Sequence, residues 1–307
     1  MRAFFLYLAR KEGFKNFALR FRFFRGTAAR FIAGDSLDDA IRVVKQTNRL
    51  KLKGTLDLLG EYTRTPEDAR AACEELIRVQ DRIHGERADC NLSIKLTQIG
   101  LKLDPAFCER NLAQIAEHAK DLGNFVRVDM EDSSCTDHTL EIVERTCREM
   151  GNVGTVIQAY LYRSERDTVR MMEKGIRIRL VKGAYREPDN IAFRRKKETD
   201  ANYIQLMKAL LENGTYPAIA THDVRIIQAA KEFVQIRNIP KDSFEFQMLY
   251  GIRRDLQQQL GRDGYNVRVY IPYGAHWYPY FMRRLGERPA NVIFLVRNLF
   301  MERRITD

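Results

Sequence analysis

Residues 54–98 read GTLDLLGEYTRTPEDARAACEELIRVQDRIHGERADCNLSIKLTQ, and two short β-rich stretches in them flank a longer amphipathic segment. The β-rich stretches are 54–61 and 91–98. The segment between them repeats apolar residues at helical spacing, and it opens with Thr65 as a candidate N-cap and Pro66 at the first helical position. This order predicts two parallel strands joined by a helix in a right-handed crossover.

The same alternation continues along the chain. Six more β-rich stretches are 125–132, 155–161, 176–185, 217–223, 244–251 and 267–274. Eight such units match the number and the size of an α/β fold of the (βα)8 TIM-barrel type, which commonly uses about 250 residues. An open doubly wound sheet is the alternative, but it normally carries a glycine fingerprint after its first strand, and no GxGxxG occurs here.

Residues 1–45 precede the first strand and have helical periodicity, and no linker rich in Gly, Pro or Ser divides the chain. We therefore expect an N-terminal helical extension over 1–45 and one catalytic barrel over 46–307, including the final helices. The first residues, MRAFFLYLARKEGF, lack the cleavage site of a signal peptide and are interpreted as part of the mature protein.

The composition is that of a globular protein, with 45% hydrophobic and 30% charged residues in 307. Apolar runs such as VIFL and AFFLYLA are far shorter than the roughly 20 residues that cross a bilayer. Five scattered cysteines without a CxxC pair predict neither a disulfide framework nor a zinc or other metal site. A reducing, cytoplasmic location fits best.

The net charge of +11 admits nucleic acid, an anionic membrane surface or anionic substrates as partners. Arginine, lysine and phenylalanine alternate in residues 14–31, a pattern that suits a helix at the inner face of a membrane, on the protein's own core or on another subunit. No RNA-binding signature is present, so nucleic acid is not expected.

Reactive groups of such barrels gather where the strands end. The polar residues there are Glu61, Lys95, Asp129, Glu131, Gln158, Arg179, Lys182, Thr221, His222, Asp223, Gln247, Tyr250 and Tyr270. Any one of them has a structural explanation: Asp129 as an ion-pair partner of Lys95 or Arg179, His222 as a capping residue. Together they favour an anionic or zwitterionic ligand. Gly183 ends the basic stretch RIRLVKG, residues 177–183, and as a glycine it lets a bound group come close to the backbone. Together with Arg179 and Lys182 it favours a cofactor with phosphate groups or an anionic ring.

The stretch YIPYGAHWYPYFMRRLGER, residues 270–288, follows the last strand with a helix. In isolation, tyrosines in the core with arginines in solvent explain this pattern. Next to the charged strand ends, Tyr280, Arg283, Arg284 and Glu287 lie largely on one side of the helix. The planar arginine fork binds carboxylates in two parallel hydrogen bonds, so we expect a compact carboxylic acid as ligand.

Eight motifs resemble, in order, the strand motifs of the proline dehydrogenase family. They are DLLGE, SIKLTQ, VRVDMED, VIQAYL, RLVKGAY, ATHD, FEFQMLYGI and YIPYG followed by RRLGER. The resemblance covers about residues 50–300. It implies a distorted (βα)8 barrel that binds FAD, oxidises L-proline to Δ1-pyrroline-5-carboxylate by hydride transfer to flavin N5, and passes electrons to a membrane quinone. The aldehyde dehydrogenase module of some relatives is missing, which implies the monofunctional type.

The resemblance also assigns roles by motif. Arg283, Arg284 and Lys95 would bind the substrate carboxylate, and Glu61 would pair with Arg283 as a gate. The residues around the substrate ring would be Tyr270, Tyr280, Ala184, Tyr185 and Leu249, with Asp129 ordering the site. Arg179 would lie at flavin N5, and the other FAD contacts would be Asp129, Gln158, Val181, Lys182, Gly183, Ala184, Thr221, His222, Gln247 and Glu287. Arg186 replaces a tryptophan that is common after GAY in relatives.

Three other functions compete with this one. A Schiff-base aldolase would use Lys95 or Lys182 as its nucleophile. A flavin barrel of the methylenetetrahydrofolate reductase type shares the architecture without paired arginines on its last helix. A non-enzymatic protein would dock on membranes or nucleic acid through residues 1–32. The residues identify no general base for amine oxidation.

Overall fold

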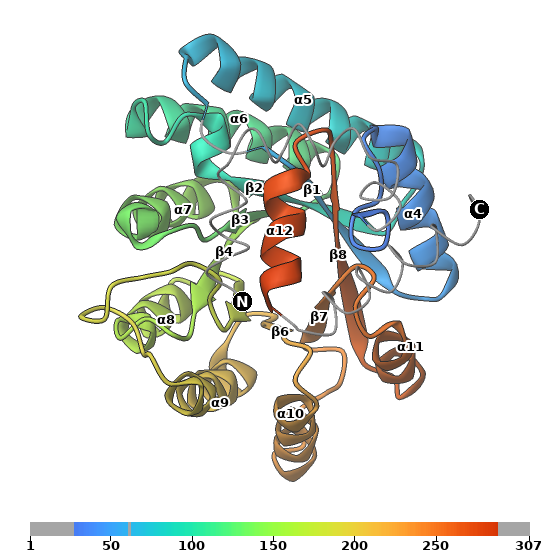
Figure 1. The fold of residues 1–307 in the computed structure, drawn as a ribbon, viewed down its shortest axis with the longest axis vertical. Coiled ribbons are helices and arrows are strands. Elements are labelled where there is room, and N and C mark those ends of the chain that lie inside the picture. The colour runs from blue at the N-terminus through green and yellow to red at the C-terminus, as the bar shows by residue number, and fades with distance from the viewer. Residues whose placement is uncertain (1–27, 61–62, 288–307) are drawn as a thin grey trace, which may run out of the picture.

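The computed structural model describes residues 28–60 and 63–287; within the last helix the side chains of Arg283, Leu285 and Glu287 are excluded. The described residues form a closed barrel of eight parallel strands in sequence order (Figure 1). The strands are β1 Lys53–Leu58, β2 Cys90–Lys95, β3 Val126–Asp129, β4 Val153–Gln158, β5 Ile178–Val181, β6 Ala218–Ala220, β7 Glu245–Leu249 and β8 Asn266–Tyr273. The predicted α/β barrel is confirmed.

Helices alternate with the strands, and all of them except the last, α12, lie on the outside of the barrel (Figure 1). They are α4 Leu37–Arg49, α5 Pro66–Gly85, α6 Pro105–Asp121, α7 Thr136–Met150, α8 Ser164–Glu173, α9 Lys196–Asn213, α10 Val224–Ile236, α11 Arg254–Arg262 and α12 Tyr278–Glu287. The predicted cap of α5 is present, because the Thr65 side chain accepts a hydrogen bond from the Asp68 amide, and Pro66 occupies the first turn. No helix among the described residues is both long and apolar enough to cross a membrane.

Every predicted strand is present, but each ends before its predicted C-terminal residue. The stretch 91–98, for example, is β-strand only as far as Lys95, and Leu96–Ile99 form a turn of 3-10 helix. These residues are nevertheless buried, which is why the sequence there resembles a strand. The chain leaves the sheet at the point where it begins to build the loops of the site.

The barrel departs from the regular form at its last helix. Packing contacts place α4, which precedes the first strand, against β8 and β1. Figure 1 shows α12 lying across the barrel, where Tyr278 and Phe281 pack with Phe31, Leu59 and other apolar residues. Because α4 packs beside β8, α12 is available to cover the end of the barrel at which the strands finish.

The aliphatic core lies between the strands and the outer helices, whereas the interior of the barrel is polar. Near the start of the strands, Arg268 Nε donates to both oxygens of Glu245 at 2.9 and 3.0 Å, and Arg127 Nη1 donates to the Thr155 carbonyl at 2.8 Å. Gly154 provides room for this arginine, because a Cβ there would lie 2.8 Å from Arg127 Nη1. We call Arg127, Glu245 and Arg268 the lower layer.

The division into an extension over 1–45 and a barrel over 46–307 remains a prediction. Residues 1–27 lie outside the described part of the chain, as does most of the predicted basic helix at 14–31. Helix α4 crosses the predicted boundary and packs directly on the barrel.

Candidate active site

A cavity of about 760 Å³ opens at the C-terminal ends of the strands, between the barrel and α12. Many of its lining residues were predicted from the sequence: Lys95, Asp129, Gln158, Arg179, Val181, Lys182, Gly183, Ala184, Tyr185, Thr221, His222, Gln247, Leu249, Tyr270, Tyr280 and Arg284. These predicted residues come from six strands, from loops and from the last helix, and the fold brings them to one place. Their individual roles remain predictions.

Some predicted residues are not part of this lining. Glu61 lies outside the described residues, and the side chains of Arg283 and Glu287 are likewise not described, so the predicted Glu61 gate stays a prediction. The Glu131 carboxylate accepts hydrogen bonds from the amide and hydroxyl of Thr97 at 3.1 and 2.6 Å and does not line the cavity. Its carboxylate holds the loop after β2 instead.

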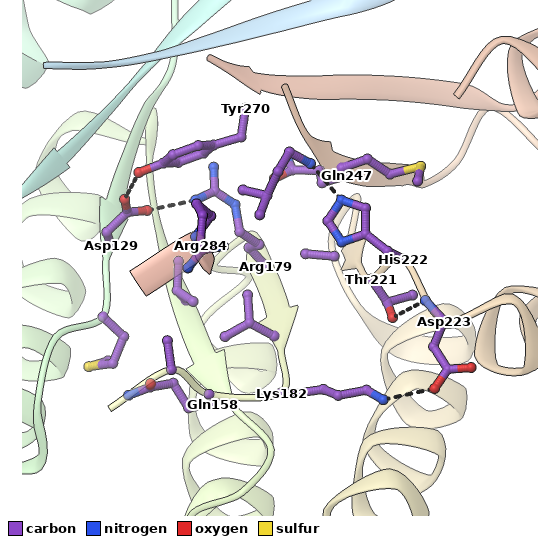
Figure 2. Close-up of a pocket in the computed structure, with 18 of the residues that line it drawn as sticks. Asp129, Gln158, Arg179, Lys182, Thr221, His222, Asp223, Gln247, Tyr270 and Arg284 are labelled. Carbon is purple, nitrogen blue, oxygen red and sulfur yellow. Dashed lines mark hydrogen bonds and ion pairs between the residues drawn. The ribbon is translucent and has the colours of Figure 1, made fainter. Parts of the chain in front are cut away.

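Asp129, at the end of β3, lies at the centre of the most connected group in the cavity. Its Oδ1 accepts from Arg179 Nη1 at 2.6 Å and from the Ser93 hydroxyl at 2.7 Å, and its Oδ2 accepts from the Tyr270 hydroxyl at 2.7 Å (Figure 2). Burial alone would raise the pKa of Asp129, but Arg179, Lys95 and these donors hold it below its ordinary value. Asp129 is therefore a fixed negative charge. The predicted pairing with Arg179 is present.

Asp57, in β1, is a cavity residue that the sequence analysis missed. It is 1% exposed, and its Oδ1 accepts from Lys95 Nζ at 2.7 Å; the same Nζ lies 3.9 Å from Asp129 Oδ2. Burial and the nearby charge of Asp129 raise the pKa of Asp57 against the opposing effect of Lys95. A signal was present in the sequence, because Asp57 is the one acid inside the apolar run TLDLL.

Arg179 lines the cavity, with its guanidinium carbon 5.2 Å from the centre of the Tyr270 ring. It is 4% exposed, and besides Nη1 it has two further donor nitrogens, Nε and Nη2. Neither has a hydrogen-bond partner within the described part of the chain. A buried arginine with two donors left over is suited to hold an acceptor group that enters from the cavity.

Helix α12 contributes one cation, Arg284, and one aromatic ring, Tyr280, to the cavity lining. Arg284 is only 9% exposed, and its guanidinium carbon lies 5.1 Å from the centre of the Tyr280 ring. Both residues line the cavity, so the interpretation of Arg284 as a solvent-exposed arginine is wrong. The tyrosine part of that interpretation holds for Tyr278, which is 1% exposed and packs beneath the helix.

The outer end of the cavity has a second charged group. Lys182 Nζ donates to Asp200 at 2.6 Å and to Asp223 at 3.1 Å, and Lys196 and Arg225 pair with the same two carboxylates. Although burial raises the pKa of Asp223, Arg225 and Lys182 lower it below its ordinary value. Asp200, on α9, was not predicted, because its distance from any strand end gave no signal in the sequence.

Two loop residues have clear structural reasons for their identity. Gly183 has φ +113°, and a Cβ there would lie 2.3 Å from the Tyr160 ring. A glycine is therefore required here by the packing of Tyr160, in addition to the predicted close approach of a bound group to the backbone. His222 Nε2 accepts from the Leu249 amide at 2.9 Å. This contact joins the β6 and β7 loops and fits the alternative interpretation of His222 as a structural residue. Arg186 is exposed and is not in the lining.

Comparisons with known proteins agree with this geometry. A sequence model of the family described as proline dehydrogenase matches residues 40–297. Proline dehydrogenase 1 of Bacillus subtilis subsp. natto is 42% identical over 299 residues, which cover 97% of this chain and 99% of the relative. Proline dehydrogenase of Deinococcus radiodurans is 43% identical over 277 residues, 89% of either chain.

A solved structure is similar over most of the barrel. The crystal structure of proline utilization A from Bdellovibrio bacteriovorus, inactivated by N-propargylglycine, superposes with a TM-score of 0.80 at 29% identity. The match covers 85% of this chain and 32% of the other, so this chain spans about a third of that larger protein and nearly all of the Bacillus relative.

Proposed function

The chain belongs to the proline dehydrogenase family and is an enzyme of proline catabolism, and on that premise we propose that it oxidises L-proline to Δ1-pyrroline-5-carboxylate with bound FAD and a quinone acceptor. The observation that carries the proposal is the charge distribution of the cavity. A buried arginine on α12 and buried carboxylates on β1 and β3 line one enclosed space. Proline is a zwitterion whose carboxylate and ammonium need opposite partners of this kind.

The residues of the cavity fit a flavin. Arg179 Nε and Nη2 lack protein partners among the described residues, and these donors suit the acceptor atoms of an isoalloxazine ring. Lys182, Gly183, Gln158, Thr221 and Gln247 would hold the rest of the cofactor, with Lys182 in a group of three cations and two acids suited to its phosphates. When bound, the flavin accepts a hydride from the ring carbon next to the proline nitrogen.

Substrate orientation is the task of this chain's own side chains. Arg284 would bind the proline carboxylate in a site where little water competes, since the residue is 9% exposed. Predicted contributions from Arg283 and Lys95 to the same carboxylate belong to this proposal. Tyr270, Tyr280 and Leu249 would enclose the apolar ring and exclude water from the reacting carbon.

The competing enzyme functions have less support. A Schiff-base lysine must be neutral to attack a carbonyl, whereas Lys95 and Lys182 are both cations of carboxylate ion pairs. The family assignment and the cationic α12 also favour an amino-acid substrate over a folate. Quinone reduction and peripheral membrane contact through residues 1–32 are parts of the proposal that rest on the family and the sequence alone.

A spectrum of the purified protein tests the proposal. The protein should be yellow from oxidised flavin, and anaerobic addition of L-proline should bleach that absorbance band. A protein that stays colourless after incubation with FAD, or a flavin band that proline leaves unchanged, would contradict the assignment. Trapping of a substrate on Lys95 or Lys182 by borohydride would instead indicate the aldolase.

A further inference from the structure

Amine oxidation requires a proton acceptor that the residues discussed so far do not supply. Proline in neutral water is a secondary ammonium, and its ring carbon can release a hydride only when the nitrogen has a lone pair to form the carbon–nitrogen double bond. A site that binds this ammonium form must therefore accept the proton inside the cavity. A suitable acceptor is a side chain that faces the cavity, is ionised and has an unoccupied acceptor atom.

Most titratable groups of the cavity lining already have their acceptor atoms in use. Asp223 is held by Lys182 and Arg225, and His222 Nε2 accepts from the Leu249 amide. Lys95 is the cation of two ion pairs and has no lone pair with which to take a proton. Among the described lining residues, this leaves the carboxylates of Asp57 and Asp129.

The two carboxylates differ in how completely they are satisfied. Asp129 accepts from three donors on both oxygens, whereas Asp57 accepts from Lys95 on Oδ1 alone. The Tyr270 hydroxyl lies close enough to both acids to lower the pKa of each, and its hydrogen bond of 2.7 Å is to Asp129 Oδ2. Within the described residues, Asp57 Oδ2 is buried and has no hydrogen-bond partner. Asp57 is thus the buried acid with capacity left for a cation or a proton.

The pKa values of the two acids also distinguish Asp57 from Asp129. The pKa of Asp129 is lowered below its ordinary value and that of Asp57 is raised, mainly by burial and then by the charge of Asp129. Two neighbouring acids with pKa values displaced in opposite directions commonly divide the tasks of fixed charge and proton acceptor. Lys95 opposes the rise at Asp57 without reversing it.

We propose that Asp57 binds the ammonium group of proline and accepts its proton; this inference rests on the function proposed above. The N–H bond breaks, its electron pair stays on nitrogen, and the proton forms an O–H bond on Asp57 Oδ2. The nitrogen lone pair then forms the C=N bond as the hydride leaves the ring carbon. The enzyme returns to its starting state when Asp57 releases its proton to water.

This role has a defined pH dependence. Asp57 faces Lys95 on β2, Asp129 on β3 and Tyr270 on β8; the pKa of Asp129 is lowered below its ordinary value and burial raises that of Tyr270 well above its own. Asp57 must be ionised to accept the proton. The rate of flavin reduction at saturating proline should therefore fall as pH is lowered through the raised pKa of Asp57.

The variant Asp57→Asn tests the proposal, because the amide keeps the size and an oxygen toward Lys95 but takes no proton at neutral pH. We expect stopped-flow flavin reduction by proline to slow about 10²-fold or more, within the range of general base catalysis. The acidic limb of the pH profile should disappear. Asp57→Glu should recover part of the rate. As a matched control, Asp167→Asn removes a buried, ion-paired carboxylate from α8, outside the cavity, and should keep both the rate and the profile.

A second measurement separates proton transfer from an indirect effect on Lys95. A ring-oxygen analogue of proline has the carboxylate but no ammonium, so its affinity reports carboxylate binding alone. Its Kd should be equal in wild type and Asp57→Asn. If the variant loses affinity for this analogue by the same factor as it loses reduction rate, Asp57 only orients Lys95 and the proposal is wrong.

The remaining outcomes are also decisive. Wild-type reduction kinetics in Asp57→Asn would overturn the role of Asp57 while leaving proline oxidation intact. Should the variant fail to take up FAD, the wild-type enzyme decides: a reduction rate at saturating proline that is independent of pH on the acid side contradicts the proposal. Absence of proline-dependent bleaching in the wild type would instead be a failure of the proposed function itself.

Discussion

The interior of the barrel holds two layers of buried charge that serve different purposes. The lower layer, Arg127, Glu245 and Arg268, lies near the start of the strands, and its groups bond mainly to each other and to backbone carbonyls. The upper layer of Asp57, Lys95, Asp129 and Arg179 lies where the strands end and faces the cavity. We use these two names below.

The two layers differ in which polar atoms have no hydrogen-bond partner among the described residues. The Glu245 carboxylate has both oxygens occupied, and although burial raises its pKa, Arg268 lowers it below the ordinary value. In the upper layer, Asp57 keeps an acceptor and Arg179 keeps two donors without partners in the described residues, all on cavity-lining side chains. Arg127 Nε likewise has no hydrogen-bond partner in the part of the chain that the structure describes, but Arg127 does not line the cavity. Charge that is bonded within the fold is structural, whereas spare polar atoms at a cavity indicate a ligand site.

The variant Glu245→Gln is the strongest test of the structural role of the lower layer. The substitution leaves Arg268 buried without its counter-charge, so we expect a loss of about 3–5 kcal/mol in the free energy of unfolding. The KM for proline in the folded fraction should be unchanged. Urea denaturation followed by circular dichroism measures the first quantity. A variant of normal stability with an altered KM would reverse the assignment of the layers.

The opposite pattern is expected for Arg284→Met. Removing the buried guanidinium deletes a charge-assisted contact to the substrate carboxylate, and the KM for proline should rise on the order of 10²-fold to 10³-fold. The urea midpoint should stay close to that of the wild type. Steady-state kinetics with an artificial electron acceptor measures the effect, and an unchanged KM would remove Arg284 from the carboxylate site.

Arg179→Met should separate chemistry from binding. The expected loss is about 10²-fold in the rate of flavin reduction, since donors near the reacting part of the cofactor stabilise developing charge. The affinity for proline should change less than this rate. Rapid-mixing reduction over a range of proline concentrations gives both quantities. Reduction at the wild-type rate would show that the spare donors of Arg179 have no catalytic effect.

The smallest effect is a difference in acid stability. The pKa of Glu245 is lowered in the folded state, so its stabilisation is present above its ordinary value of 4.5 and is lost as pH falls through the lower, folded value. The pKa of Asp57 is raised, so its ionised form destabilises the fold above that pKa, and protonation relieves the cost. As pH rises from the lowered pKa of Glu245 to its ordinary value of 4.5, the Tm difference from wild type should become more negative for Glu245→Gln and then level off. As pH rises from 3.8, the ordinary value of Asp57, to its raised pKa, the Tm difference should become more positive for Asp57→Asn. Equal slopes in the two variants would contradict the comparison.

Much of the fold was predictable because parallel strands and outer helices have different periodicities. The eight strands, the α5 cap and most of the cavity lining follow from local patterns and from the rule that barrel sites lie at strand ends. Tyr280 and Arg284 follow from no strand pattern; their helical spacing after the last strand indicated them, and the family motif agreed.

The rest depends on tertiary contacts that no single segment encodes. The charge environment of Asp57 depends on Lys95 and Asp129, which lie on the next two strands. Asp200 is connected to the cavity by its ion pair with Lys182. The strand ends were placed too late because buried loop residues such as Leu96 have the same apolar character as strand residues. The position of α12 depends on α4 packing beside β8, a contact between opposite ends of the chain.

That contact has a consequence for biosynthesis. The barrel closes when residues 53–58 of β1 pair with residues 268–273 of β8, the strand that leaves the ribosome last. Until then β1 is an open edge, and α4 has no neighbouring β8 to dock against. A nascent chain must therefore hold its first strand unpaired on one side until the eighth strand has been synthesised, which makes this edge a natural place for a chaperone to bind.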